Sequence, residues 1–200
     1  MSSLVISGDT SGSITLSAPA VSGTNTATLP AATGTVMVSG NMPAFSASLS
    51  TNPTLTAGVN LTLPFANKTA GIGSGLQGFD TAGCFNNTNG TVTLNGISVP
   101  AYSFAPNVAG YYFFSVVIGI YYPSSGVYNL VIMRKNNVNS IVGAAAGSGG
   151  TAEVTCPCSG LIYMNGTSDY VTAIVQTGSS GCSVDSGSNG VWSGYLVRAA

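Results

Sequence analysis

The sequence contains no histidine. Its absence excludes Ser-His-Asp and Cys-His nucleophile systems, together with every metal site that has a histidine ligand. No Walker motif and no Gly-x-Ser-x-Gly elbow occurs either. The stretch GSGLQG at 73–78 has the spacing of a dinucleotide-binding loop. No buried strand precedes it, no helix follows it and no acidic residue stands about 20 residues downstream, so it is interpreted as an ordinary glycine-rich loop and no cofactor is expected.

Charge is almost as scarce as histidine. Lys and Arg number four and Asp and Glu five, which is 4% of the chain, where about 25% is usual. Arg134 and Lys135 form the only adjacent basic pair. Nucleic acids and anionic membrane surfaces attract clustered positive charge, so neither is expected as a partner. The N-terminus lacks the basic start and apolar core of a secretory signal, which predicts synthesis in the cytosol.

Paired carboxylates could still cleave a glycan. The candidates Asp80, Glu153, Asp169 and Asp185 are isolated from one another and stand near turn residues. Asp80 and Asp185 are expected to form turns through hydrogen bonds to the backbone, and Asp169 to begin a strand. No Asp-x-Asp-x-Asp spacing indicates a calcium loop. The sequence therefore favours a protein that is not an enzyme.

The sequence does not decide whether its four cysteines form disulfides, bind zinc or remain thiols. Cys84, Cys156, Cys158 and Cys182 could form two disulfides in three pairings, but their spacing requires none. The Cys-Pro-Cys pair departs from the Cys-x₂₋₄-Cys pairs of zinc sites. Free, buried thiols that pack as small apolar side chains are the favoured interpretation.

Strand signals dominate the chain, and no window has the apolar periodicity of a helix. Short β-branched and aromatic runs recur between clusters of Gly, Asn, Ser and Pro, which is typical of an all-β sandwich or barrel. Asn-Gly, the dipeptide favoured in tight hairpin turns, occurs at 89–90, 95–96 and 165–166. The runs are SITL, TVMV, NLTL, TVTL, VYNLVIM, EVTC, LIYM, YVTAIVQ and YLVR.

The first 42 residues differ from the rest. They hold one charge, Asp9, and no aromatic residue. We expect an extended docking arm at 1–42, which adds strands to a partner's sheet edge, and a compact domain at 43–200; an unstructured tail is the alternative. The apolar residues expected to dock are Leu4, Ile6, Ile14, Leu16, Leu29, Val36 and Val38.

Several segments resemble the complement C1q and tumour-necrosis-factor superfamily. FAPNVAGYYFFS at 104–115 is similar to its signature strand, PAFSA at 43–47 to its opening strand, and GVWSGYLVR at 190–198 to its closing strand. Ser168 and Trp192 depart from the family's usual Gly and Phe. The resemblance covers about 43–198 and implies a jelly-roll sandwich that associates as a homotrimer.

The apolar run at 111–122 has no charge and is too short for a membrane span of about 20 residues. It lacks the alternation of a strand with one wet face, so both of its faces should be covered. Tyr112, Phe114, Val116, Ile118 and Ile120 are assigned to the core. The other face is assigned to the trimer interface, since interface cores favour Tyr and Phe; its large residues are Tyr111, Phe113, Val117 and Tyr121.

Residues 8–36 resemble a segment near the start of tailed-bacteriophage virion proteins. Together with the C1q-like domain, this implies a trimeric capsid decoration protein that binds the major capsid protein. It would be made in the bacterial cytoplasm and lie on the outer surface of the phage head. The rival hypothesis is a tail-fibre or receptor-binding protein. Its binding platform would use some of Tyr121, Tyr122, Tyr128, Tyr163 and Trp192.

Overall fold

A computed structural model describes residues 3–7, 9–17, 20–21, 23–24, 26, 42–66, 78–121, 128–146, 153–186 and 190–200. The chain divides into two compact units, Met1–Thr35 and Val36–Ala200. No helix occurs in these described ranges, and so none there is long and apolar enough to cross a membrane. The expected boundary at residue 42 remains a prediction.

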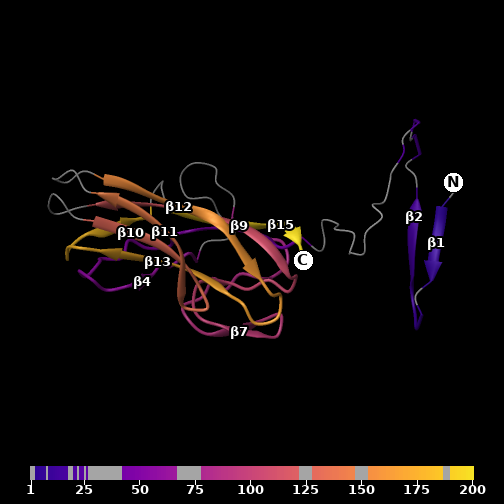
Figure 1. The fold of residues 1–200 in the computed structure, drawn as a ribbon, viewed down its shortest axis with the longest axis horizontal. Helices are drawn as coiled ribbons and strands as arrows, with labels where there is room; N and C mark the ends of the chain where they lie inside the picture. Colours follow the sequence, from indigo (N-terminus) through magenta and orange to yellow (C-terminus); the bar gives the residue numbers. More distant parts are fainter. Residues whose placement is uncertain are drawn as a thin grey trace. The chain divides into compact units, whose positions relative to one another are not determined.

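The first unit contains one antiparallel hairpin, in which β1 (Ser3–Ser7) pairs with β2 (Ser13–Ser17). In the second unit, two antiparallel sheets form a sandwich (Figure 1). The five-stranded sheet has the order β11 (Val138–Ala146), β10 (Tyr128–Lys135), β13 (Val171–Thr177) and β4 (Leu61–Thr62), with β8 (Ser103–Phe104) also paired to β13.

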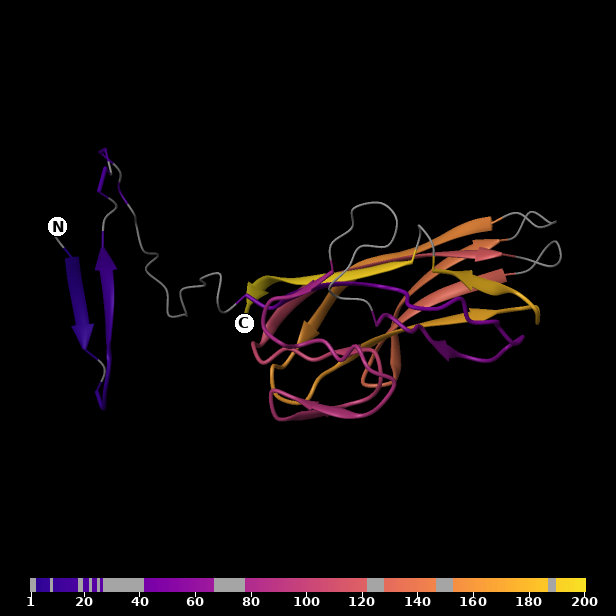
Figure 2. The same cartoon turned by 180° about the vertical axis from the view of Figure 1, so that it is seen from behind.

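The six-stranded sheet has the order β12, β9, β15, β3 and β5, with β14 also paired to β9. A small hairpin of β6 and β7 lies at the lower edge of the sandwich in both views (Figures 1 and 2). The bounds are β3 Ala44–Ser48, β5 Phe79–Asp80, β6 Val92–Leu94, β7 Ile97–Val99, β9 Gly110–Tyr121, β12 Glu153–Met164, β14 Ser183–Asp185 and β15 Val191–Ala199.

The all-β sandwich predicted from the sequence is confirmed. Residues 111–121 of the apolar run lie in β9, an interior strand of its sheet, and PAFSA contains β3. EVTC and LIYM, predicted as separate runs, are one long strand that continues through Pro157. Proline is tolerated in an edge strand, where no ladder hydrogen bond needs its missing N–H. The run TVMV lies outside the described residues.

Aromatic side chains fill the core between the sheets. The Phe45 ring stacks on Phe85 and Phe104, each with ring centroids 4.7 Å apart, and meets the edge of Trp192 at 5.0 Å. Trp192 is fully buried. The five β9 residues assigned to the core are also fully buried, so that assignment is confirmed; they are Tyr112, Phe114, Val116, Ile118 and Ile120.

The three Asn-Gly dipeptides have different roles. Asn95-Gly96 joins β6 to β7 with φ of 50° and 82°, the left-handed pair that a tight hairpin turn needs. Asn89-Gly90 lies in a bend and Asn165-Gly166 in the connection from β12 to β13, so neither closes a hairpin. A further hairpin turn, at Asn136 and Asn137, joins β10 to β11 with φ of 51° and 66°.

Candidate interaction surface

The outer face of the sheet formed by β12, β9 and β15 carries large apolar side chains that no described residue covers. Leu161 is 58% exposed, Tyr195 51%, Tyr111 49% and Tyr163 41%, and Phe113 is half-buried among them. We call this the apolar sheet face; it consists of Tyr111, Phe113, Val117, Leu161, Tyr163, Val191 and Tyr195.

Strand register arranges this face in rungs. Leu161, Phe113 and Tyr195 lie opposite one another across three strands. The Phe113 and Tyr195 rings are 5.8 Å apart, and on the neighbouring rung the rings of Tyr111 and Tyr163 are 5.4 Å apart. Aromatic rings at these spacings are in contact. The two pairs, on neighbouring rungs, therefore form a continuous apolar surface.

A row of serines crosses the same sheet next to the aromatic rungs. Ser159, Ser115, Ser193 and Ser46 lie opposite one another on four adjacent strands. Their small side chains leave a shallow strip between the aromatic rungs and the rung that contains Val117. On β9 the small residues Ser115 and Gly119 alternate with the larger ones of this face, and Ser159 and Ser193 continue the serine row on the neighbouring strands.

Charged groups stand at the two ends of the face. At the Tyr121 end, Glu153 opposes Tyr121 and lies over Gly119, while Asp185 opposes Gly119. The negative charges of Asp185 and Glu153, with a hydrogen bond to Glu153, raise the pKa of Tyr121 above its ordinary value.

At the opposite end, Arg198 opposes Tyr111 and the Lys135 Nζ lies 5.6 Å from the centroid of the Tyr163 ring. Lys135 also donates a hydrogen bond to the Tyr163 carbonyl at 2.7 Å. The rungs between the two ends carry no charged residue, which suits an apolar contact bordered by polar groups.

All four residues predicted for the trimer interface lie on the outer side of β9. Tyr111 and Tyr121 are exposed, and Phe113 and Val117 are half-buried. Sequence reasoning missed Leu161 and Tyr195 as members of the same face. Their alternation within LIYM and YLVR was visible, but the register that places them beside Phe113 was not.

The proposed tyrosine platform requires a correction. Trp192 lies in the core, because its position on β15 points inward between Phe45 and Phe65. Tyr163 and Tyr121 stand at opposite ends of β9 and β12, since Tyr163 opposes Tyr111 and Tyr121 opposes Glu153. Tyr121 and Tyr128 remain exposed, at 41% and 49%. Tyr122 lies outside the described residues.

The candidate carboxylates have structural positions. Asp80 accepts hydrogen bonds from the backbone N–H of Cys84 at 2.9 Å and of Phe85 at 3.2 Å, as predicted for a turn residue. Asp185 was expected to form a turn but ends strand β14, because it pairs with Gly119 of β9. Asp169 was expected to begin a strand, but β13 begins two residues later, at Val171.

Asp169 organises the loop that follows β12. Its carboxylate accepts hydrogen bonds from Asn136 at 2.7 Å and from the Asn165 backbone at 2.8 Å, and pairs with Lys135 at 2.7 Å. Burial alone would raise the pKa of Asp169, but the bonds from Lys135, Asn136 and Asn165 outweigh it and lower the pKa below its usual value. The cluster fixes two loops and has a structural role.

None of the four cysteines forms a disulfide, and all four are buried. Burial raises the pKa of the Cys156 thiol to about 11 and that of Cys158 above its ordinary value. A thiol that stays protonated is a poor nucleophile and a poor metal ligand. Among the described residues, no three His, Cys, Asp or Glu side chains come together as a metal site.

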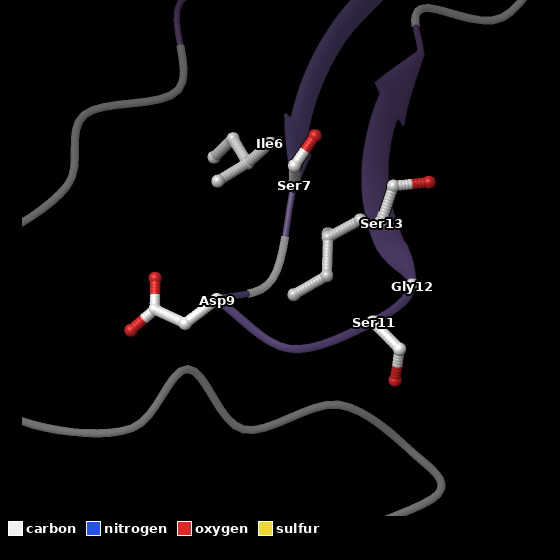
Figure 3. A pocket seen from close by; sticks show the side chains of 7 residues that line it. Ile6, Ser7, Asp9, Ser11, Gly12 and Ser13 are labelled. Atoms are coloured by element: carbon white, nitrogen blue, oxygen red, sulfur yellow. The ribbon is translucent and has the colours of Figure 1, made fainter.

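The predicted arm contains a hairpin whose aliphatic residues are exposed. Leu4, Ile6, Ile14 and Leu16 are between 52% and 67% exposed. An open hollow of about 590 Å³ lies beside the turn, and Asp9 is the one ionisable residue that lines it (Figure 3). The lining residues are Ile6, Ser7, Asp9, Ser11, Gly12, Ser13 and Ile14. A single carboxylate among serines offers no catalytic or metal-binding set. The remaining predicted docking residues, Leu29, Val36 and Val38, lie outside the described residues.

Two antiparallel sheets with this strand order define a jelly roll of the tumour-necrosis-factor type. The chain is similar to the crystal structure of murine APRIL at pH 5.0, with a TM-score of 0.50 and 7% identity over 78% of this chain and 98% of that one. A structure of Eiger TNF from S. frugiperda gives a TM-score of 0.47 and 7% identity over 80% of this chain and 93% of that one. No family model and no curated protein matches the sequence. The likeness identifies the fold alone.

Proposed function

We propose that this chain is a non-enzymatic structural protein of a tailed-phage virion. It assembles as a homotrimer through the apolar sheet face and decorates the capsid, with the N-terminal arm attaching it to the major capsid protein. It is made in the cytoplasm of the bacterial host and resides on the outer surface of the head.

The apolar sheet face carries the proposal. Four of its large side chains are 41% to 58% exposed and are contiguous across β12, β9 and β15. Monomeric proteins rarely leave such a patch in water, and Tyr and Phe are enriched in the cores of protein interfaces. The resemblance of residues 43–198 to C1q-like domains implies a homotrimer. We therefore propose that two further copies of the chain cover the apolar sheet face.

The virion assignment is supported by the resemblance of residues 8–36 to virion segments and by the arm's exposed hairpin. A decoration protein binds the assembled shell and not its free subunits, and thereby stabilises the shell by mass action. Three arms on one trimer bind with high avidity even where each arm binds weakly, because the second and third contacts are intramolecular.

A non-enzymatic role agrees with the positions of the carboxylates. Asp80 and Asp169 accept backbone hydrogen bonds that close turns, and Asp169 also pairs with Lys135. Glu153 and Asp185 stand beside Tyr121 on a sheet.

A tail-fibre or receptor-binding role is the second candidate, and one observation favours it. Tyr121 and Tyr128 are exposed at the same end of the sandwich, where β9 ends and β10 begins. Exposed tyrosines suit recognition of host glycans or proteins, because a ring and a hydroxyl are offered together.

The copy number of the chain in purified phage particles separates the two roles. Quantitative mass spectrometry should give a ratio to the major capsid protein of the same order as one for decoration. A small fraction of that ratio would support the fibre role, and absence from particles would contradict the virion assignment. Light scattering of the purified chain should give the mass of a trimer.

A further inference from the structure

The β1–β2 hairpin is symmetric in its side chains. Leu4 opposes Leu16, Ile6 opposes Ile14 and Ser7 opposes Ser13. Strand alternation places the two leucines and two isoleucines on one side of the hairpin and Val5 with Thr15 on the other. One side is therefore wholly aliphatic, with a leucine rung next to an isoleucine rung. We call this the aliphatic hairpin face, made of Leu4, Ile6, Ile14 and Leu16.

The aliphatic hairpin face must be buried against another surface for the hairpin to be stable. All four side chains are more than half exposed, and a lone two-stranded hairpin is at best marginally stable in water. Burying the four aliphatic groups would supply the stability that the hairpin lacks, since each buried apolar side chain favours the folded form.

We infer that the aliphatic hairpin face packs against the same face of the other two chains of the homotrimer, so that three arms form one bundle. The inference rests on the proposed trimer. Parallel hairpins around a threefold axis would bring leucine rungs together in one layer and isoleucine rungs in the next. Asp9, the only charged side chain of the first 42 residues, lies in the turn, at the end of the hairpin beside Ile6 and Ile14. The leucine and isoleucine rungs themselves carry no charge.

The tether makes this contact accessible within one trimer. Residues 18–41 separate the hairpin from the first described residue of the domain, Met42. A chain of that length spans at most about 80 Å when fully extended. Attachment to one trimer keeps the three hairpins within a bounded distance of one another, so that a contact between them is intramolecular. Sister hairpins are therefore concentrated around one another before the trimer reaches a shell.

The bundle changes the predicted docking contacts. Leu4, Ile6, Ile14 and Leu16 would join arm to arm, and the shell would meet the opposite side of the hairpins and their outer strand edges. That side carries Val5 and the hydroxyl groups of Ser7, Ser13, Thr15 and Ser17. Strand edges bind extended segments of other proteins through backbone hydrogen bonds, and hydroxyl-bearing side chains keep the bundle soluble until then.

Cysteine cross-linking of the full chain tests the bundle. Ile14→Cys places a thiol on the aliphatic hairpin face, and Thr15→Cys, the matched control, places one on the opposite side; the native thiols are buried. Mild copper-phenanthroline oxidation joins two thiols only where they come within bonding distance. It should give disulfide-linked dimers of Ile14→Cys several times faster than of Thr15→Cys, and dilution of the trimer should not slow the reaction.

Hydrogen exchange of the unsubstituted chain provides a second readout without a substitution in the hairpin. Backbone amides of β1 and β2 should be protected in the trimer and lose protection in a variant that is folded but monomeric. Equal cross-linking of the two cysteine variants, or unprotected hairpin amides, in a chain that is trimeric by light scattering would overturn the bundle and leave the trimer standing. A monomeric full-length chain would overturn both.

Discussion

Phe113 of β9 and Tyr195 of β15 lie directly opposite each other on an exposed sheet face, with ring centroids 5.8 Å apart. Leu161 of β12 opposes Phe113 from the other side. These three residues make an apolar rung that crosses three strands of the sheet. In the proposed trimer this rung is the place where a charge does most harm, because a buried charge without a partner is costly.

Leu161→Asp should therefore convert the trimer to folded monomers. The wild-type side chain is 58% exposed, so the isolated domain should tolerate the substitution with little change in its free energy of unfolding. Val142→Asp is the matched control: Val142 is 53% exposed on β11, in the other sheet. Light scattering should give a monomer mass for Leu161→Asp and a trimer mass for Val142→Asp. A trimeric Leu161→Asp would contradict the proposed interface.

The two faces of β9 could be predicted from the sequence because side chains alternate along any strand. The extent of the apolar sheet face could not. Leu161 and Tyr195 join Phe113 through the register of β12 and β15, which are far from β9 in the chain. Trp192 shows the same limit: without a register, nothing in VWSGYLVR decides whether Trp192 or its neighbours point inward.

Gly96→Ala should destabilise the domain, whereas Gly90→Ala should not. Both glycines follow an asparagine and have open space where a methyl group would stand, but Gly96 alone has a left-handed φ, +82°. A residue with a Cβ is strained there, which costs about 1 kcal/mol. Urea unfolding of the two variants measures the difference. Equal losses would show that the β6–β7 turn does not depend on the conformation of Gly96.

This pair also shows why Asn-Gly dipeptides predicted turns but not hairpins. The dipeptide favours left-handed conformations locally, and what it connects depends on the flanking strands. At Asn95-Gly96 these strands pair with each other, while at Asn165-Gly166 they belong to different sheets. Hydrophobic pattern alone does not distinguish the two cases.

The four cysteines should resist modification while the protein is folded. All are buried, and the pKa of Cys156 is raised to about 11, which leaves almost no thiolate at neutral pH. A chromogenic disulfide reagent at pH 8 should report no fast thiol in the native protein and four after unfolding in guanidinium. Rapid reaction of the native protein would contradict the buried, reduced state of these side chains.

Asp169→Asn should lower stability at neutral pH by about 2 kcal/mol, since the buried carboxylate loses charged hydrogen bonds. The pKa of Asp169 is lower in the folded chain than in the unfolded one, so its contribution is fully present above the unfolded pKa. It is lost as the pH falls through the folded value. The difference between wild type and Asp169→Asn should therefore shrink once the pH drops below about 4, the ordinary range of an aspartate.

The measurement is urea unfolding of both proteins from pH 7 down to pH 3, with Asp9→Asn as a control for an exposed carboxyl of the arm. Lys135 is the one basic side chain that pairs with Asp169 in the described structure. A difference that remains constant with pH would mean that the substitution acts through altered packing, because the loss of charge at Asp169 removes only a pH-dependent contribution. Convergence at low pH would instead assign the stability of the loop between β12 and β13 to the charge of Asp169.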